Sequence, residues 1–219
     1  MVPLWMATHG WRRVVFDSRR ARLVVAGVAA AAALLAGCSS DPNSVAAQAR
    51  SGDRKGYVSG DGTVQQIAQN KRRAPLVVTG TTLDGKAWSS VQARGTVLVL
   101  NVWGSWCGPC VKEAPVLQKV YAKTQLDKSP VTFMGLDVKE SPESANAFVR
   151  SRGITYPSLA FDGGKPLLGL KGQAPTVPTT LVLDSQGRLA SRVLGPLSES
   201  TLTGLIHDAL LEHRQSATR

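Results

Sequence analysis

Two cysteines separated by two residues are the side chains of this sequence best suited to covalent chemistry. Cys107 and Cys110 enclose Gly108 and Pro109, between a β-branched apolar segment and a helical one. A thiol in the first turn of a helix lies at the positive end of the helix dipole, near free backbone N–H groups, and both favour the thiolate. Such a pair can exchange disulfides: Cys107 would attack, and Cys110, one turn further in, would resolve the mixed disulfide.

The same spacing also fits half of a zinc site or a passive structural disulfide. Zinc needs four ligands, but the other cysteine, Cys38, is far away, and His207 and His213 have no metal-ligand spacing to the pair. A two-residue loop constrains the unfolded chain little, so a structural disulfide would stabilise little. The redox interpretation is favoured, with no metal and no other cofactor.

The elements that would position this pair follow Pro75, where strand and helix patterns begin to alternate. Strands are predicted at 96–102, 131–138, 180–183 and 189–194, a turn at 83–86, and helices at 108–125, from 141 and from 198. This order predicts an α/β domain over 74–219, with a central mixed β-sheet flanked by helices on both faces. The polar segment 38–73 is predicted to be a flexible tether, in which 64–68 could form one helical turn.

The N-terminal segment has the pattern of a secretory signal peptide. An arginine-rich start is followed by an uncharged run over 23–36, which is short for a membrane span. Leu35-Ala36-Gly37-Cys38 resembles the bacterial lipobox, so we expect a lipoprotein-type signal peptide over 1–37 and a lipid on Cys38. A signal-anchor helix with an incidental cysteine is the alternative, and both place the remainder outside the cytoplasm.

The formal net charge of +11 does not indicate a nucleic-acid surface. Many basic residues lie in the leader and in the segment 39–73, and no basic stripe carries interleaved aromatic residues. Attraction to anionic lipid headgroups is the simpler use of this charge. The arginine pair in the leader leaves the general and the twin-arginine export routes both open.

Three motifs together resemble the thioredoxin family over about residues 74 to 213. They are Trp106-Cys-Gly-Pro-Cys110, Val-Pro178-Thr and Leu-Gly195-Pro-Leu-Ser. The resemblance implies a thioredoxin-like fold, a cis proline at Pro178 facing the cysteines, and substrate contacts from Trp106, Val177, Pro178 and Gly195. A strand-edge proline is the alternative explanation for Pro178.

The run from Cys110 to Pro115 is similar to the TlpA/ResA-like subgroup of membrane-tethered, extracytoplasmic thiol-disulfide oxidoreductases. In that subgroup an acid at the position of Glu113 helps proton handling, whereas thioredoxin has a buried aspartate at the position of Asn101. The resemblance therefore makes Glu113 the candidate acid/base. Spacing alone also allows a solvated helix acid paired with Lys112 or Lys119.

The resemblance implies a membrane-tethered enzyme that acts on protein disulfides and dithiols, and we expect it to be a monomer. The Gly-Pro dipeptide favours reduction, which outside the cytoplasm requires a membrane electron donor of the CcdA/DsbD type, and cytochrome c maturation is the subgroup's commonest task. A redoxin-type thiol peroxidase would need threonine or serine at Gly104. A non-catalytic binding lipoprotein would have no use for both cysteines.

Overall fold

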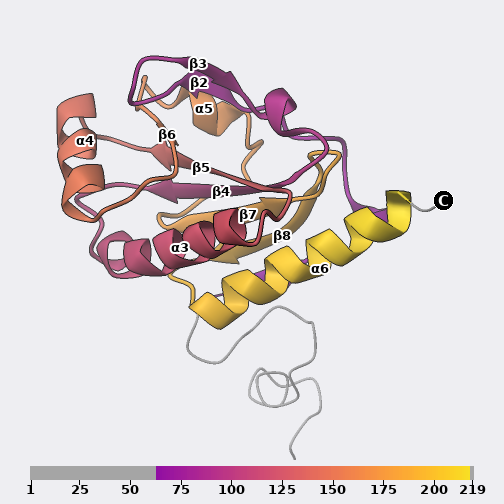
Figure 1. Ribbon diagram of the computed structural model, residues 1–219. Coiled ribbons are helices and arrows are strands. Elements are labelled where there is room, and N and C mark those ends of the chain that lie inside the picture. The colour runs from indigo at the N-terminus through magenta and orange to yellow at the C-terminus, as the bar shows by residue number, and fades with distance from the viewer. Residues whose placement is uncertain (1–62, 218–219) are drawn as a thin grey trace, which may run out of the picture. The chain divides into compact units, whose positions relative to one another are not determined.

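The computed structural model describes residues 63–217 (Figure 1). The strands are β1 (Thr63–Gln66), β2 (Thr79–Thr81), β3 (Ala87–Ser89), β4 (Val97–Trp103), β5 (Val131–Asp137), β6 (Ser158–Leu159), β7 (Thr179–Leu183) and β8 (Leu189–Leu194). The α-helices are α3 (Gly108–Leu126), α4 (Pro142–Ser151), α5 (Lys165–Leu168) and α6 (Glu199–Ala217), and the 3-10 helices are η1 (Gln69–Lys71) and η2 (Ser90–Ala93).

A six-stranded mixed sheet forms the centre of the domain, in the order β1-β8-β7-β4-β5-β6. β4 pairs parallel with β5 and antiparallel with β7, so it is the strand from which the cysteine turn leaves the sheet. β2 and β3 form a separate two-stranded sheet, joined to β6 by a bridge between Thr82 and Leu159. The predicted fold class, a mixed sheet with flanking helices, is confirmed.

β4 is buried on both faces, which explains its continuous apolar sequence. Val97, Val99 and Trp103 belong to one core cluster, with residues of α3, α4 and α6. The alternate side chains, such as Leu98 and Leu100, belong to a second cluster. The two clusters follow from the period of two in a strand.

The two faces are covered unequally. The longer helices α3, α4 and α6 contribute to the first cluster, whereas α5, η2 and the small β2-β3 sheet lie over the second face (Figure 1). Ser141 caps α4 by accepting a hydrogen bond from the Ser144 N–H, and Pro142 occupies its first turn, as the sequence indicated.

The domain extends further towards the N-terminus than predicted. β1 pairs antiparallel with β8, so Val64 contributes to the core and the segment 63–73 belongs to the folded domain and not to a tether. The helical turn proposed for 64–68 is wrong, because these residues form the edge strand and its exit. The remaining predicted strands and helices are found within a few residues of their predicted positions, while β2, β3, β6 and α5 were not predicted.

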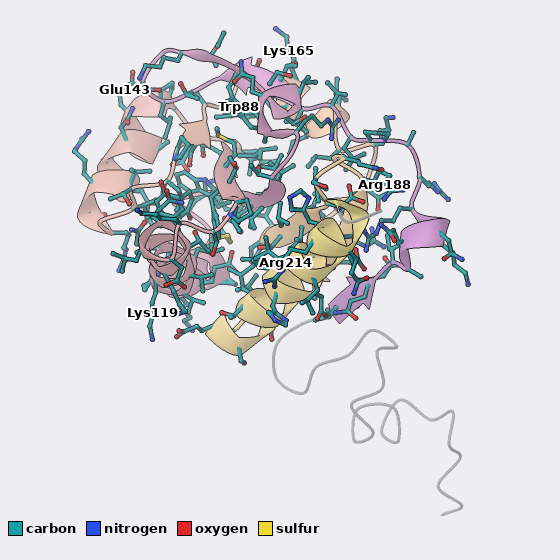
Figure 2. The ribbon with its side chains drawn as sticks, turned by 45° about the vertical axis from the view of Figure 1, so that its right-hand side comes forward. Trp88, Lys119, Glu143, Lys165, Arg188 and Arg214 are labelled. Carbon is teal, nitrogen blue, oxygen red and sulfur yellow. A yellow bond between two sulfur atoms is a disulfide. The ribbon has the colours of Figure 1, made fainter. Side chains whose placement is uncertain are left out.

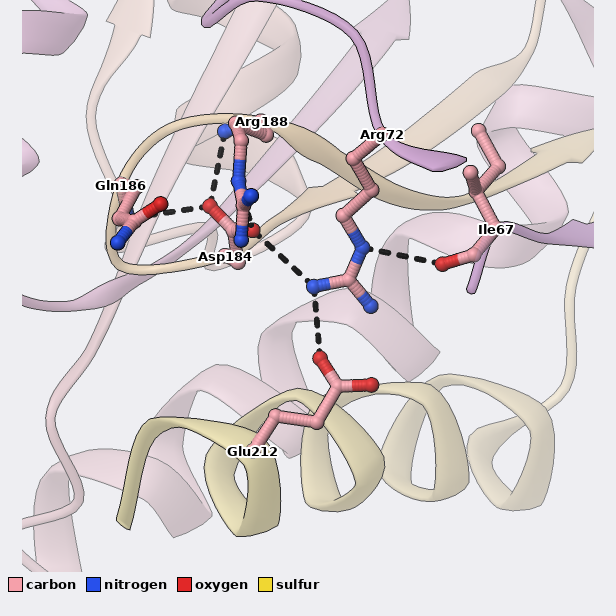
Figure 3. Close-up of polar contacts among 6 residues, drawn as sticks. All are labelled: Ile67, Arg72, Asp184, Gln186, Arg188 and Glu212. Atoms are coloured by element: carbon pink, nitrogen blue, oxygen red, sulfur yellow. Dashed lines mark hydrogen bonds and ion pairs between the residues drawn. The ribbon is translucent and has the colours of Figure 1, made fainter. Parts of the chain in front are cut away.

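A buried arginine fixes this N-terminal segment to the rest of the domain (Figure 3). The Arg72 guanidinium lies 3.0 Å from the Asp184 carboxylate and 2.6 Å from that of Glu212, and its Nε donates to the Ile67 carbonyl. Asp184 belongs to the β7-β8 turn and Glu212 to α6. Arg72 therefore ties three separate segments together.

Within residues 63–217, none of the helices is long and apolar enough to cross a bilayer. The predicted signal peptide over 1–37, the lipid site Cys38 and the tether as far as residue 62 lie outside the described residues.

Candidate active site

The two cysteines form a disulfide at the start of α3. Cys107 is the N-cap of this 19-residue helix, and its Sγ accepts a hydrogen bond from the Cys110 N–H at 3.3 Å. Their Cα atoms are 5.2 Å apart. When this bond is reduced, the same N–H group and the helix dipole stabilise a thiolate on Cys107 over the thiol.

Both cysteines are largely buried. Cys107 is 5% exposed and Cys110 2% exposed, so in this oxidised form little of either residue is open to solvent. This difference is small, and the assignment of Cys107 as the attacking sulfur stays a prediction. Gly108 and Pro109, between them, are exposed and leave the turn open to a partner.

The loop before β7 lies beside the cysteine turn because β7 runs antiparallel to β4. Val102 of β4 pairs with Thr179, so Pro178, just before it, lies at the edge of the sheet where the cysteine turn leaves β4. The Val177–Pro178 peptide bond is cis, as the resemblance implied. Gly195 donates its N–H to the Pro178 carbonyl at 2.9 Å and has a φ of 105°, which favours glycine. Three of the four expected substrate-contact residues are thus brought together.

Trp106, the fourth, is half exposed at 53% and anchored by its indole N–H. Nε1 donates to the Val138 carbonyl at 2.9 Å, at the end of β5. A side chain at Gly104 would meet this ring, since a Cβ there would lie 2.5 Å from Nε1. Gly104 therefore lets the indole lie against the cysteine turn.

Glu113 is buried inside the domain and is not a solvated helix acid. Its carboxylate accepts hydrogen bonds from the Asn101 side-chain amide of β4 at 3.0 Å and from the Leu197 N–H at 3.3 Å. It is 2% exposed, and Lys119, its suggested surface partner, pairs instead with Glu199. The alternative of a surface ion pair is wrong.

Burial raises the pKa of Glu113 to about 7, although the hydrogen bonds from Asn101 and Leu197 lower it. A carboxyl with such a pKa can both take up and release a proton near neutral pH. Glu113 lies one turn after Cys110 on α3, and its role as proton acceptor for the resolving thiol stays a prediction. Asn101 holds this carboxyl in place and donates its second amide hydrogen to Thr180.

Sequence reasoning missed a second acid that holds the cysteine turn. Glu140, which follows β5, accepts a hydrogen bond from the Ser105 N–H at 2.6 Å through Oε1 and a second from the Ser105 hydroxyl through Oε2. Ser105 lies two residues before Cys107. Glu140 therefore fixes the entry to the turn through both oxygens.

Asp137, the last residue of β5, is buried next to this acid. Burial and the neighbouring Glu140 carboxyl raise the pKa of Asp137 to about 8. No motif marks either acid. They reach the cysteine turn because β4 and β5 are parallel, so the end of β5 lies at the same edge of the sheet as the turn that follows β4.

The chain matches known proteins over this domain. The Redoxin family model matches residues 69–206. The thiol-disulfide oxidoreductase ResA of Bacillus thuringiensis (strain Al Hakam) is 31% identical over 135 residues, which cover 62% of this chain and 75% of the relative. The thiol:disulfide interchange protein HelX of Rhodobacter capsulatus is 36% identical over 117 residues, covering 53% of this chain and 62% of HelX.

Solved structures with the same fold include two from Corynebacterium. A DsbF homologue from Corynebacterium diphtheriae is 31% identical, with a TM-score of 0.58, over 69% of this chain and 96% of its own. A secreted thiol-disulfide isomerase from Corynebacterium glutamicum is 27% identical, with a TM-score of 0.63, over 71% of this chain and 96% of its own.

Proposed function

Because this chain belongs to the Redoxin family and is a TlpA/ResA-like thiol-disulfide oxidoreductase with a thioredoxin fold, we propose that it reduces disulfides of other proteins outside the cytoplasm. The observation that carries the proposal is the Cys107–Cys110 pair at the start of α3, with a buried acid of raised pKa one turn further on.

In the proposed reaction, the Cys107 thiolate attacks a substrate disulfide and one substrate sulfur leaves as a thiolate. Cys110 loses its proton to Glu113 and attacks the Cys107 sulfur of the mixed disulfide. The second substrate sulfur then leaves, and the Cys107–Cys110 disulfide is formed. Two electrons have passed from the cysteine pair to the substrate.

The cysteine loop is the support for the reducing direction. Its Gly-Pro dipeptide is that of reducing thioredoxins, whose potentials are about −270 mV, against about −120 mV for the strong oxidant DsbA. Outside the cytoplasm a reductant must be recharged, and we propose a membrane donor of the CcdA/DsbD type that returns two electrons to the pair. The subgroup's commonest task makes apocytochromes c the first clients to test.

Equilibration of the Cys107/Cys110 couple in buffers of defined thiol and disulfide ratio tests the direction. We expect a potential closer to that of thioredoxin than to that of DsbA. A potential of about −120 mV would make the protein an oxidant and overturn the proposed direction.

Alkylation of the reduced protein at mildly acidic pH tests the two sulfur roles. The N-cap position favours the Cys107 thiolate, so Cys107 is expected to be labelled first. Faster labelling of Cys110 would reverse the assignment.

We propose that the chain is held at the membrane by a lipid on Cys38, after removal of residues 1–37. The support is the Leu-Ala-Gly-Cys run behind an arginine-rich leader. Intact-mass analysis of the membrane-extracted protein should show a diacylglycerol-bearing cysteine at the new N-terminus. An unmodified Cys38 or a retained leader would contradict the anchor.

A further inference from the structure

A cavity lined by cations lies where β1 and β8 meet the segment before β7. Its volume is about 540 Å³, and four basic side chains, those of Lys71, Arg73, Lys171 and Arg192, line it with no acidic residue among its walls. Leu76 forms part of its apolar lining. Among residues 63–217, no ion pair involves any of these four cations.

The Arg192 side chain is held in place by the fold. Arg192 pairs in register with Gln65 of β1, and its guanidinium donates to the side-chain oxygen of Gln173 at 3.1 Å. Its Nε is buried and has no hydrogen-bond partner among the described residues. Lys71 ends η1, which leads directly to Arg72, the buried anchor of this segment. A buried donor without an acceptor, beside unpaired cations, indicates a site for an anionic group.

Exposed apolar side chains lie next to this cavity. Val77 is 48% exposed and follows Leu76 of the cavity lining, while Leu168 is 78% exposed at the end of α5. The two segments touch, because a Cβ on Gly169 would lie only 2.3 Å from the Val77 carbonyl oxygen. Lys171, on the cavity wall, donates its N–H to the Leu168 carbonyl.

We propose that this surface, defined by the cationic cavity together with Val77 and Leu168, binds the anionic phospholipid surface of the membrane. Phosphate groups of lipids would accept hydrogen bonds from the cations, and the two apolar side chains would enter the interface. A free phosphate would satisfy the cavity but not the exposed apolar residues, which is why a lipid surface is favoured. The inference goes beyond disulfide exchange and does not depend on it.

The position of the surface in the chain fits this occupant. Gln65 of the cavity wall is close to Thr63, where the described domain begins. If Cys38 carries the proposed lipid, residues 39–62 link it to this wall and can span at most roughly 80 Å. Such a link keeps the surface at high effective concentration near the bilayer, so weak contacts suffice.

Chemical modification of lysines on vesicles tests the proposal. The full chain is reconstituted in vesicles of phosphatidylcholine alone or mixed with phosphatidylglycerol, and acylation rates are measured for Lys71, Lys171 and, as a reference, Lys123. Lys123 lies on α3, which packs on the other face of the sheet; Figure 2 likewise shows Lys165 of α5 and Lys119 of α3 on opposite sides of the molecule. We expect the anionic lipid to slow acylation of Lys71 and Lys171 roughly fivefold or more, and that of Lys123 little.

Three variants assign the effect to this surface. Arg73→Glu should abolish most of the protection because it repels the headgroups, and Leu168→Ser should reduce it while leaving the charges intact. Arg150→Glu has the same charge change on the exposed face of α4, and we expect it to leave the protection unchanged. Equal protection on both kinds of vesicle, or equal loss in Arg150→Glu, would overturn the proposal.

Two further arms, without vesicles, identify the occupant. Protection by inorganic phosphate alone would make the cavity a small-anion site, and protection by poly-glutamate alone would make the surface a site for acidic proteins. Either result would overturn membrane binding. Reduction of a soluble disulfide substrate by the same vesicles reports the proposed function separately, so the two can fail independently.

Discussion

Glu113 titrates near neutral pH, where exposed carboxyls are already ionised, so it can both take up and release a proton there, and this property underlies its predicted role. Thiolate attack by Cys107 needs no base, so Glu113 can govern only the step in which Cys110 loses a proton. We expect Glu113→Gln to slow disulfide exchange roughly tenfold, below the about 10²- to 10⁴-fold of enzymes built around an acid/base. The pH–rate profile should lose an inflection near the Glu113 pKa of about 7.

The matched control for this rate measurement is Glu199→Gln. Glu199 is also a glutamate with a polar partner, but it is exposed and forms a surface ion pair with Lys119. The control should keep both the rate and the profile of the original protein. An unchanged profile in Glu113→Gln, with the fold intact, would leave the cysteines and the Pro178 loop as the whole active site.

The same carboxyl should make stability fall with rising pH. Its pKa is about 7 in the fold and 4.5 as an ordinary glutamate, so between these values the folded state binds more protons than the unfolded state. The stability contributed by the protonated form is therefore present below pH 4.5 and lost as pH rises towards 7. The loss amounts to about 3 kcal/mol.

Denaturant unfolding of the oxidised protein across this pH range checks the sign. Glutamine does not titrate, so Glu113→Gln should not lose this stability as pH rises. The free energy of unfolding of Glu113→Gln relative to that of the original protein should therefore increase from pH 4.5 to 7, and this difference should be constant below pH 4.5. A difference that does not change with pH would show that the folded-state pKa is not raised.

At the scale of elements, the cysteine turn depends on β5 through Glu140. Glu140→Gln keeps one acceptor oxygen but removes the charge and replaces the other oxygen with a donor facing the Ser105 hydroxyl or N–H. Lost charged hydrogen bonds are worth about 1.5 to 3 kcal/mol each, so we expect the turn to loosen. Amide hydrogen exchange of Ser105 should rise roughly tenfold, and the rate of disulfide exchange should fall.

Glu143→Gln is the control for this change. Glu143 lies three residues further on, exposed in the first turn of α4, where the Ser141 side chain and its own backbone hold its pKa below the ordinary value (Figure 2). This variant should leave Ser105 exchange unchanged. If Glu140→Gln also leaves it unchanged, the turn is held by Trp106 and the disulfide instead.

The elements that were predicted from the sequence are those with a clear local pattern of apolar residues or a recognisable motif. β4 and β5 are continuous apolar runs, and the cysteine pair, Pro178 and Glu113 stand in motifs with fixed spacing. β1 lacks such a pattern, because it is a polar edge strand in which Val64 alone is buried. Its strand conformation comes from pairing with β8, which is a long-range contact that local sequence does not predict.

Local sequence also could not predict which side chains of the site are buried. On α3, spacing allowed Glu113 to face either solvent or the sheet, and the deciding partners, Asn101 and Leu197, come from β4 and from the segment before α6. Glu140 has no motif at all, and only the parallel pairing of β4 with β5 brings it to Ser105. Long-range contacts thus completed a site whose chemistry was already evident in the motifs.

At the scale of the whole molecule, Arg72 determines where the domain begins. Its side chain is 3% exposed, between Asp184, which is 7% exposed, and Glu212. Removing one partner of a buried ion pair leaves the other charge without compensation, at a cost of about 3 to 5 kcal/mol. Asp184 retains hydrogen bonds from Arg188 and from the Gln186 N–H, which places the expected loss at the lower end.

We therefore expect Arg72→Met to lower the free energy of unfolding by about 3 kcal/mol, while Arg73→Met, at the exposed neighbouring position, changes it by no more than about 0.5 kcal/mol. Because Arg72 also holds the Ile67 carbonyl, the N-terminal segment should open first. Amide exchange of Ile67, whose N–H donates to the Ala190 carbonyl, should rise more than that of β4. Equal loss of protection in β4 and at Ile67 would mean that 63–73 unfolds only with the whole domain, and an unchanged stability would return this segment to the tether that its polar sequence suggested.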